Sequence, residues 1–470
     1  MKGQPVLKLL LVFILLKFFC LTSRTAVWRS PLDFQIEPGS QTSELNFRLE
    51  NGLRVYFLPT SRYQLTSVVL AVNAGSSLEP EGLNGLAHLL EHCLLFRQVS
   101  SGGELLWPKF RELGLYLNAH TELEAMFFEI NLPPDLLPEA LSLLSELVLD
   151  FRISEEELEK EKQVVLKEIK SLARDPQRVG LAAVYSLAFP DSSYGRPVFG
   201  LEEDIKQVTP GQLKDFHARY FRPSNASLVI IGPYEAGKIK DMVRSNFSIW
   251  PDSNSFESTS LPPNSPAKIN FNKESRQVEL QMSLTETYLM AGFLAPGYSD
   301  PEQPLLDVLV EILGYGVNPL LYSAFYGHPE LVSSTKINYF MHRQAGLLVI
   351  TITTKKEKVS QVKRLLQEFF ARLPEYQFSP SDYLPGQQVF IIDFLQGAKN
   401  RIRLLAEKAL ENPLNLAMAL SRHLLFSPEF TSKNYLQTVE KIKSSGLRKL
   451  AYRYFGQGKP VWVVINPEEK

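Results

Sequence analysis

The sequence predicts an α+β fold made of two homologous half-units, each with a largely antiparallel sheet that carries helices on one face. Its 470 residues exceed what one hydrophobic core usually holds, so more than one domain is expected. Strand-like segments follow one another before the helical segments begin, which favours hairpins over a regular alternation of strands and helices. One order of helix and strand also occurs twice along the chain.

The repeated unit is a helix that ends in Arg-Tyr-Phe and leads into an apolar strand, at 226–231 and again at 461–465. Three pairs of identical residues lie 234 positions apart: Leu213 and Leu447, Phe221 and Phe455, and Pro233 and Pro467. A constant offset indicates duplication of a large unit. We therefore predict an N-terminal domain at 40–250, a Pro- and Ser-rich linker at 251–267 and a homologous C-terminal domain at 268–470.

Charge and composition describe a folded protein without a polyanionic partner. The chain is 44% hydrophobic, and 50 basic residues balance 51 acidic ones. This balance indicates no nucleic-acid surface.

The first 26 residues have the pattern of an export signal. Lys2 and Lys8 precede an apolar run at 9–16, and small or polar residues follow Leu21. We expect cleavage and a periplasmic location in a bacterium, with membrane attachment only if this segment stays uncleaved or Cys20 carries a lipid. If Cys20 leaves with the signal, Cys93 is the remaining cysteine and no internal disulfide forms.

Periodicity predicts the remaining elements in order. Strands at 44–49 and 53–58 flank Asn51-Gly52, a hairpin signal, and strands at 66–73 and 125–132 enclose a helix at 85–96. Helices follow at 134–149 and from Ser154 to about residue 172, where Ser154 and Glu157 form a capping-box pattern. In the second half we expect strands near 278–284, 288–293 and 347–353, and a helix near 303–313.

The helix at 85–96 holds His88, Glu91 and His92 among apolar residues. On a helix these positions share one face, so the three polar side chains converge. The order His-x-x-Glu-His is the inverted zincin motif. A lone buried histidine is more often a satisfied core residue than a ligand, but two of only seven histidines in this pattern favour a metal site.

A catalytic zinc site has three protein ligands and keeps a fourth position for water. Glu168 is the leading candidate for the third ligand and Glu161 the next, seven residues apart on one side of a helix. Glu91 is then available to take a proton from water and pass it to a leaving amine. Cys93 follows His92 directly and points about 100° away around the helix, so we expect a small buried side chain.

The residues at 74–76, 82–96 and 161–168 resemble the two signatures of the pitrilysin, insulysin and mitochondrial-processing-peptidase family. The resemblance implies a zinc endopeptidase that hydrolyses extended or unfolded peptides, with one Zn²⁺ per chain. It implies His88, His92 and Glu168 as ligands and Glu91 and Glu161 as the catalytic carboxylates. The segment at 118–121 is similar to the family's edge strand that pairs with substrate, which implies Asn118 and Ala119 as substrate-binding residues. The chain length resembles the short-subunit bacterial branch, with an inactive second domain.

One feature departs from that family. Its active members carry a Gly-rich loop in the second half, followed by an Arg and a Tyr that contact substrate. Here the loop is Gly314-Tyr315-Gly316, the expected positions hold Tyr326 and Ser333, and no Arg occurs between Gly314 and Met341. We therefore predict a heterodimer in which a homologous subunit supplies the Arg and Tyr.

The alternative function is that of a non-catalytic assembly or chaperone-like relative with a structural zinc site. Structural sites usually close the fourth position with Cys or His. Near the motif, the sequence offers only Cys93, which points away, and His120.

Overall fold

The computed structural model describes residues 45–96, 106–149, 151–252, 276–298, 300–316, 319–325, 328–380, 393–426 and 432–468. The predicted export signal at 1–26, with Cys20, lies outside these residues, as does the predicted linker beyond residue 252. Tyr326 lies outside them too. Within the described ranges, every helix is too short or too polar to span a bilayer.

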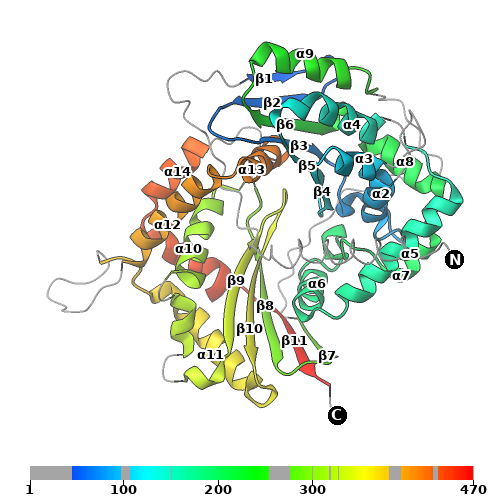
Figure 1. The fold of residues 1–470 in the computed structure, drawn as a ribbon. Coiled ribbons are helices and arrows are strands. Elements are labelled where there is room, and N and C mark those ends of the chain that lie inside the picture. The colour runs from blue at the N-terminus through cyan, green and yellow to red at the C-terminus, as the bar shows by residue number, and fades with distance from the viewer. Residues whose placement is uncertain are drawn as a thin grey trace.

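The N-terminal half contains a six-stranded sheet (Figure 1). Its strands lie in the order β1 (Leu45–Arg48), β2 (Arg54–Pro59), β6 (Ala226–Gly232), β3 (Thr66–Val72), β5 (Met126–Leu132) and β4 (Tyr116–Thr121). Only β2 and β6 pair in parallel, and the other neighbours are antiparallel. β4 is therefore an edge strand, with β5 as its partner in the sheet.

The C-terminal half repeats this arrangement in five strands. Their order is β7 (Gln277–Met282), β11 (Val461–Pro467), β8 (Thr287–Ala295), β10 (Gly346–Thr354) and β9 (Ser334–Phe340). Here only β7 and β11 pair in parallel, and the other neighbours are antiparallel. β2, β6, β3, β5 and β4 therefore match β7, β11, β8, β10 and β9 in order and direction, and the predicted α+β class with two related half-units is confirmed.

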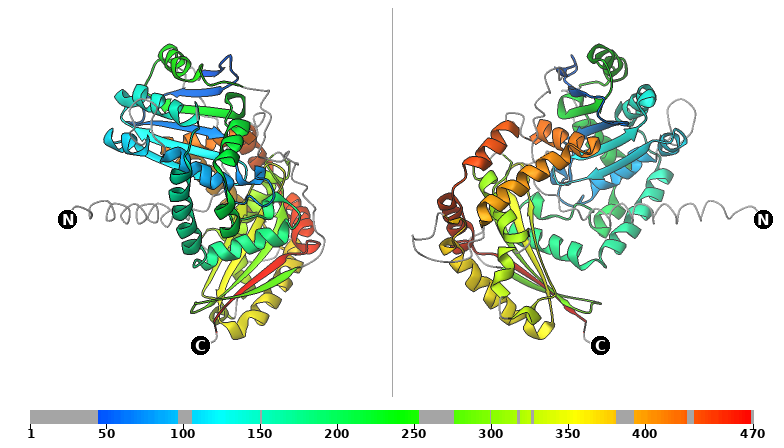
Figure 2. Two further views of the ribbon diagram at one scale, coloured as in Figure 1. Left: turned by 90° about the vertical axis from the view of Figure 1, so that its right-hand side faces the viewer. Right: turned by 60° about the vertical axis from the view of Figure 1, so that its left-hand side comes forward.

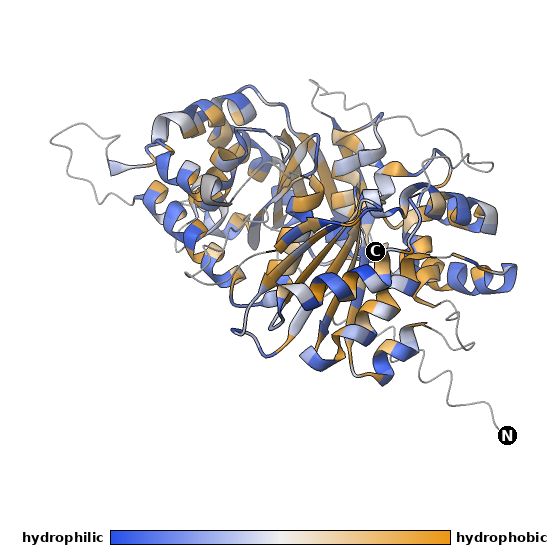
Figure 3. Cartoon of the chain, turned by 90° about the horizontal axis from the view of Figure 1, so that it is seen from above, coloured by the Kyte–Doolittle hydropathy of each residue, from blue (hydrophilic) through white to orange (hydrophobic). Residues whose placement is uncertain are grey.

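Helices fill the connections between strands. The N-terminal half has α2 (Leu86–Leu95), α3 (Leu106–Glu112), α4 (Leu137–Leu149), α5 (Glu155–Leu172), α6 (Pro176–Ala188), α7 (Glu202–Gln207), α8 (Pro210–Tyr220) and α9 (Ala236–Phe247). The C-terminal half has α10 (Gln303–Gly314), α11 (Val359–Arg372), α12 (Phe394–Ala409), α13 (Pro413–Phe426), α14 (Ser432–Lys441) and α15 (Ser444–Ala451). Figure 3 shows largely hydrophobic strands beside helices of mixed hydropathy, as expected of sheets covered by amphipathic helices.

The two halves exchange one helix each. α13 of the C-terminal half packs on β3 and β6 of the N-terminal sheet, and α6 of the N-terminal half packs on β8 and β11 of the C-terminal sheet (Figures 1 and 2). Val69 and Ile231 share a buried cluster with Leu416 of α13. The sequence predicts helices on one face of each sheet, whereas here the second face is covered by a helix of the opposite half.

Local signals in the sequence correspond to the observed boundaries. The Asn51-Gly52 hairpin joins β1 to β2, and the Asn51 amide also donates to the carbonyl oxygens of Phe247 and Trp250. The capping box of Ser154 and Glu157 is formed at the start of α5. The helix predicted from residue 134 begins at Leu137, because residues Pro134–Leu136 form a 3-10 turn.

The packing of α6 on its sheet depends on a glycine. A Cβ at Gly292 of β8 would overlap Cγ1 of Val184 on α6 and would lie 2.9 Å from Cγ2 of Val461 on β11. The close approach of α6 therefore requires a residue without a side chain at this position.

We expect Gly292→Ala to lower the free energy of unfolding by about 1–3 kcal/mol, because the added methyl group overpacks the layer between α6 and β8. Gly237→Ala in α9 is the matched control, since a Cβ there meets nothing within 4 Å. Urea unfolding of both variants measures the difference. Equal stability of the two would show that the α6 layer adjusts without cost.

Candidate metal centre

Helix α2 carries the His-x-x-Glu-His motif and begins at a sterically restricted turn. Its N-cap, Gly85, has φ of 96°, in the left-handed region that favours glycine. A Cβ there would also lie 2.7 Å from Cα of Gly200. The carboxylate of Glu79 accepts from the backbone N–H groups of Gly85 at 2.9 Å and Ala87 at 2.8 Å, so it serves as the cap that glycine lacks.

Glu79 is a residue that sequence reasoning missed. Burial raises its pKa to about 8, although the two backbone donors and Arg196 favour the ionised form. A single acidic residue six positions before a helix N-cap is no capping signal in a sequence. Its role depends on the fold of the intervening turn.

His88 and His92 lie one turn apart on α2 and both are buried, with their rings 4.9 Å apart and perpendicular. Glu168 of α5 approaches them, and its Oε2 lies 3.8 Å from His88 Nε2 and 3.4 Å from His92 Nε2. One ligand atom from each of the three residues lies within 4.8 Å of the others. In a tetrahedral zinc site with ligand bonds of about 2.0–2.2 Å, ligand atoms are about 3.3 Å apart, so this donor set fits zinc.

Glu161 takes a different position on the same helix. Its Oε2 lies 3.6 Å from His92 Nδ1, the ring nitrogen that faces away from Glu168. This oxygen is buried and makes no hydrogen bond within the described part of the chain. A carboxylate on the second nitrogen of a ligating histidine orients the ring and fixes its tautomer. Of the two glutamates considered from the sequence, Glu168, the leading candidate, lies beside both histidine Nε2 atoms, and Glu161 lies behind His92.

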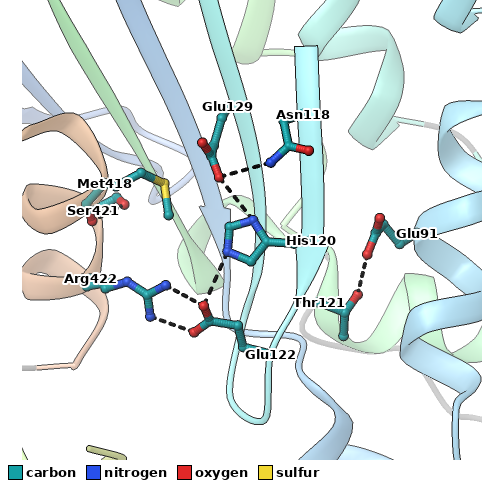
Figure 4. Close-up of polar contacts among 9 residues, drawn as sticks. All are labelled: Glu91, Asn118, His120, Thr121, Glu122, Glu129, Met418, Ser421 and Arg422. Atoms are coloured by element: carbon teal, nitrogen blue, oxygen red, sulfur yellow. Dashed lines mark hydrogen bonds and ion pairs between the residues drawn. The ribbon is translucent and has the colours of Figure 1, made fainter. Parts of the chain in front are cut away.

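Glu91 lies on the same buried face of α2 and contacts the edge strand β4. The hydroxyl of Thr121 donates to Glu91 Oε2 at 2.9 Å (Figure 4). This bond orients the carboxylate beside the ligand cluster. Thr121 was not among the predicted site residues, although it belongs to the segment at 118–121 that resembles the substrate-pairing strand.

The other residues predicted on β4 lie close to this site. Ala119 is buried, and the Asn118 amide approaches Glu129 Oε1 of β5 at 3.4 Å. Because β4 ends the sheet, its outer backbone edge is available for strand pairing.

A charged cluster lies on the opposite face of β4. His120 bridges two carboxylates, with Nδ1 3.0 Å from Glu129 Oε1 and Nε2 3.2 Å from Glu122 Oε1. Arg422 of α13 forms a two-pronged ion pair with Glu122 (Figure 4). Burial alone lowers the pKa of His120, but its bonds to the two carboxylates outweigh this effect and raise the pKa to about 9. His120 is therefore held as an imidazolium by this cluster.

Two other side chains of types that bind metal, Cys93 and His217, have different surroundings. Cys93 is buried in the N-terminal core, as predicted, and burial raises the pKa of its thiol. His217 stacks with Phe151 and Phe221. Across the ranges that the structure describes, His88, His92 and Glu168 form the one group of His, Cys, Asp and Glu residues with metal-binding spacing.

In the C-terminal half, α10 takes the place in the chain that α2 has in the N-terminal half. Helix α10, which the structure describes in full, carries no group of metal-ligating side chains like that of α2. Its Glu311 forms an ion pair with Arg401 of α12, with 3.1 Å between Glu311 Oε2 and Arg401 Nε. The Gly314-Tyr315-Gly316 loop follows α10, and the Tyr315 hydroxyl donates to the carbonyl oxygen of Ile337. Ser333 donates to Glu286.

Comparisons with known proteins agree with this architecture. Residues 57–202 match the family model described as Insulinase (Peptidase family M16), and residues 207–384 match the model of the peptidase M16 inactive domain. Two solved structures share the fold: a protease from Helicobacter pylori (TM-score 0.78, 20% identity, 91% of this chain and 100% of that one) and a peptidase M16 inactive domain from Pseudomonas fluorescens (TM-score 0.76, 17%, 91% and 98%).

Two curated relatives illustrate the sequence similarity. Cytochrome b-c1 complex subunit 1 of Bos taurus mitochondria is 25% identical over 300 residues, which are 64% of this chain and 59% of that protein. Mitochondrial-processing peptidase subunit beta of Homo sapiens is 27% identical over 267 residues, 57% of this chain and 53% of that protein. The chain thus spans little more than half the length of these relatives.

We expect Glu168→Gln to lose zinc, because an amide oxygen is a far weaker zinc ligand than a carboxylate. Glu161→Gln, on the same helix, should keep one zinc per chain at saturating metal, with affinity reduced about 10–100-fold. Metal analysis after equilibrium dialysis measures both variants. Stoichiometric, tightly held zinc in the Glu168 variant would refute its assignment as the third ligand.

We also expect a pH-dependent contribution from His120 to stability. Its folded pKa of about 9 lies above the unfolded value, so the contribution is complete below about pH 6.5 and is lost as the pH rises through 9. The loss should amount to roughly 3 kcal/mol. Urea unfolding of wild type and His120→Gln from pH 6 to 10, under one metal condition, gives the difference. A constant difference between the two proteins would contradict this role.

Proposed function

Because the chain belongs to peptidase family M16, we propose that it is a zinc-dependent endopeptidase that hydrolyses extended or unfolded peptides. The observation that carries the proposal is the convergence of His88, His92 and Glu168 with Glu91 beside them. A site with three protein ligands and a neighbouring carboxylate is the arrangement of a catalytic zinc centre rather than of a closed structural one.

Zinc, when bound by His88, His92 and Glu168, would supply a Lewis acid that polarises the scissile carbonyl and lowers the pKa of water. Glu91 takes the proton of the attacking water and delivers it to the leaving amine. Thr121 donates to one carboxylate oxygen of Glu91 and so limits its rotation. Glu161, behind His92, keeps that ring in its ligating orientation.

The position of edge strand β4 supports an extended or unfolded peptide as the substrate. An extended peptide can pair with the outer backbone of β4, beside Asn118 and Ala119, and lie next to Glu91. Such β-augmentation uses main-chain hydrogen bonds and makes little demand on sequence. It requires an unfolded segment, because a folded segment has its backbone groups already paired.

The active form is proposed to be a heterodimer. The chain has no Arg between Gly314 and Met341, where the family resemblance predicts one that contacts substrate. Its relatives include proteins named as subunits, such as the beta subunit of the mitochondrial-processing peptidase. We infer that a homologous subunit supplies the absent Arg and Tyr.

A second candidate is a non-catalytic subunit of a larger assembly. Its support is the match to cytochrome b-c1 complex subunit 1, at an identity close to that of the peptidase subunit. This candidate gives no reason for the base Glu91 to be held beside the cluster by Thr121, so we rank it second.

The decisive assay combines zinc content with turnover of an unstructured fluorogenic peptide. We expect chelator-sensitive cleavage by the zinc-loaded chain with its homologous subunit, and a loss of kcat of at least about 1,000-fold in Glu91→Gln with zinc retained, because proton transfer then lacks its base. Equal turnover by the Glu91 variant would refute the mechanism. No turnover in any combination would favour the assembly role.

The subunit requirement is tested in the same assay. The isolated chain should show little turnover, and adding the homologous subunit should restore it. Full chelator-sensitive turnover by the chain alone would show that a single copy or a homodimer suffices.

A further inference from the structure

Edge strand β4 connects the proposed base to the opposite half of the molecule. On one face, Thr121 reaches α2 and donates to Glu91. On the other face, His120 and Glu122 meet Glu129 and Arg422 (Figure 4). Successive side chains of a strand point to opposite faces. Glu122 directly follows β4, so its side-chain contacts lie one residue along the chain from the contact between Thr121 and Glu91.

The C-terminal half holds the β4–β5 turn at both of its glutamates. Arg422 of α13 makes its two-pronged ion pair with Glu122, and the backbone N–H of Arg343 donates to Glu124 Oε2 at 2.8 Å. The Arg422 guanidinium lies 4.5 Å from the centre of the Phe127 ring and is buried. A buried, two-pronged arginine contact fixes direction as well as distance, which distinguishes it from a mobile surface ion pair.

The backbone of this turn is fixed from the N-terminal half as well. The Glu122 carbonyl accepts from the Ser76 N–H at 3.0 Å, and the Glu122 N–H donates to the carbonyl oxygen of Ala125 at 2.8 Å. These bonds hold the main chain of the turn. The side chain of Glu122 is held by Arg422 and His120.

Helix α13 gives Arg422 a rigid base. It packs on β3 and β6 and fills the face of the N-terminal sheet opposite α2. The sheet therefore lies between the metal-binding helix of its own half and a helix of the other half. At the end of edge strand β4, a contact from each side of the sheet reaches adjacent residues, Thr121 of β4 and Glu122 of the turn that follows.

We propose that Arg422, a residue of the C-terminal half, is a positioning residue for the base Glu91, acting through Glu122 of the β4–β5 turn and Thr121 of β4. The half without a metal site thereby contributes to the centre of the other half within one chain. The effect of this positioning role on turnover depends on the proposed peptidase function. It is separate from the subunit requirement, because every residue involved belongs to this chain.

The test uses Glu122→Gln with Arg422→Met, which removes the ion pair without leaving one charge buried and unpaired. We expect kcat to fall about tenfold, with zinc content unchanged and KM within about threefold, because the backbone pairing of β4 with β5 remains. Thr121→Val should lower kcat similarly and add little in the double-variant background. Thr121→Ser, which keeps the hydroxyl, should retain kcat.

The matched control is Glu302→Gln with Arg453→Met, which removes an ion pair whose partners both lie in the C-terminal half. It should leave kcat and zinc content unchanged. If the Glu122 and Arg422 variant also turns over at the wild-type rate with full zinc, the positioning role is wrong while the proposed function stands. Additive losses with Thr121→Val would equally overturn it, since independent sites add.

A separate readout covers the case in which the wild type has no turnover and the proposed function fails. Hydrogen exchange of the backbone amides of residues 116–121 then measures directly how often β4 opens. Exchange at least about tenfold faster in the double variant, with the control unchanged, supports the contact from Arg422. Unchanged exchange at these residues overturns it.

Discussion

The burial of three polar side chains on one face of α2 is the constraint around which the site is built. His88, Glu91 and His92 are each less than 5% exposed. Buried polar groups are costly unless they find partners, so neighbouring elements must supply them. α5 contributes Glu168 and Glu161, and β4 contributes Thr121. The same packing that satisfies these groups gathers the candidate ligands His88, His92 and Glu168 and orients Glu91.

Each half supplies one helix to the sheet of the other half, α6 to the C-terminal sheet and α13 to the N-terminal sheet, so the two halves pack as one structure. Each sheet would otherwise leave an apolar face uncovered, because its own helices lie on the other side. A helix from the opposite half covers that face, so neither half completes its core alone. This mutual dependence also carries Arg422 to the edge of the N-terminal sheet, next to the strand that contacts Glu91.

Much of the fold follows from local patterns. The bounds predicted for β1, β2, β3 and α5 lie within a few residues of the observed ones. The signals used were the Asn51-Gly52 turn, the Ser154 cap and the apolar runs. Two strand pairings could not be predicted in this way. The parallel pairs β2–β6 and β7–β11 join segments about 170–190 residues apart, and nothing local in either partner specifies the other.

The helix period alone placed His88, Glu91 and His92 on one face, because positions three and four apart on a helix are neighbours. It also limited the third ligand to two glutamates on one side of a later helix. Which of the two approaches the histidine Nε2 atoms depends on how α5 packs against α2, and only the tertiary structure decides it. The same holds for Glu79, Thr121 and Arg422, whose partners lie on other elements. Sequence periodicity predicts the direction in which a side chain points from its own helix or strand. A contact between two elements also depends on where each element lies in the fold, which periodicity does not give.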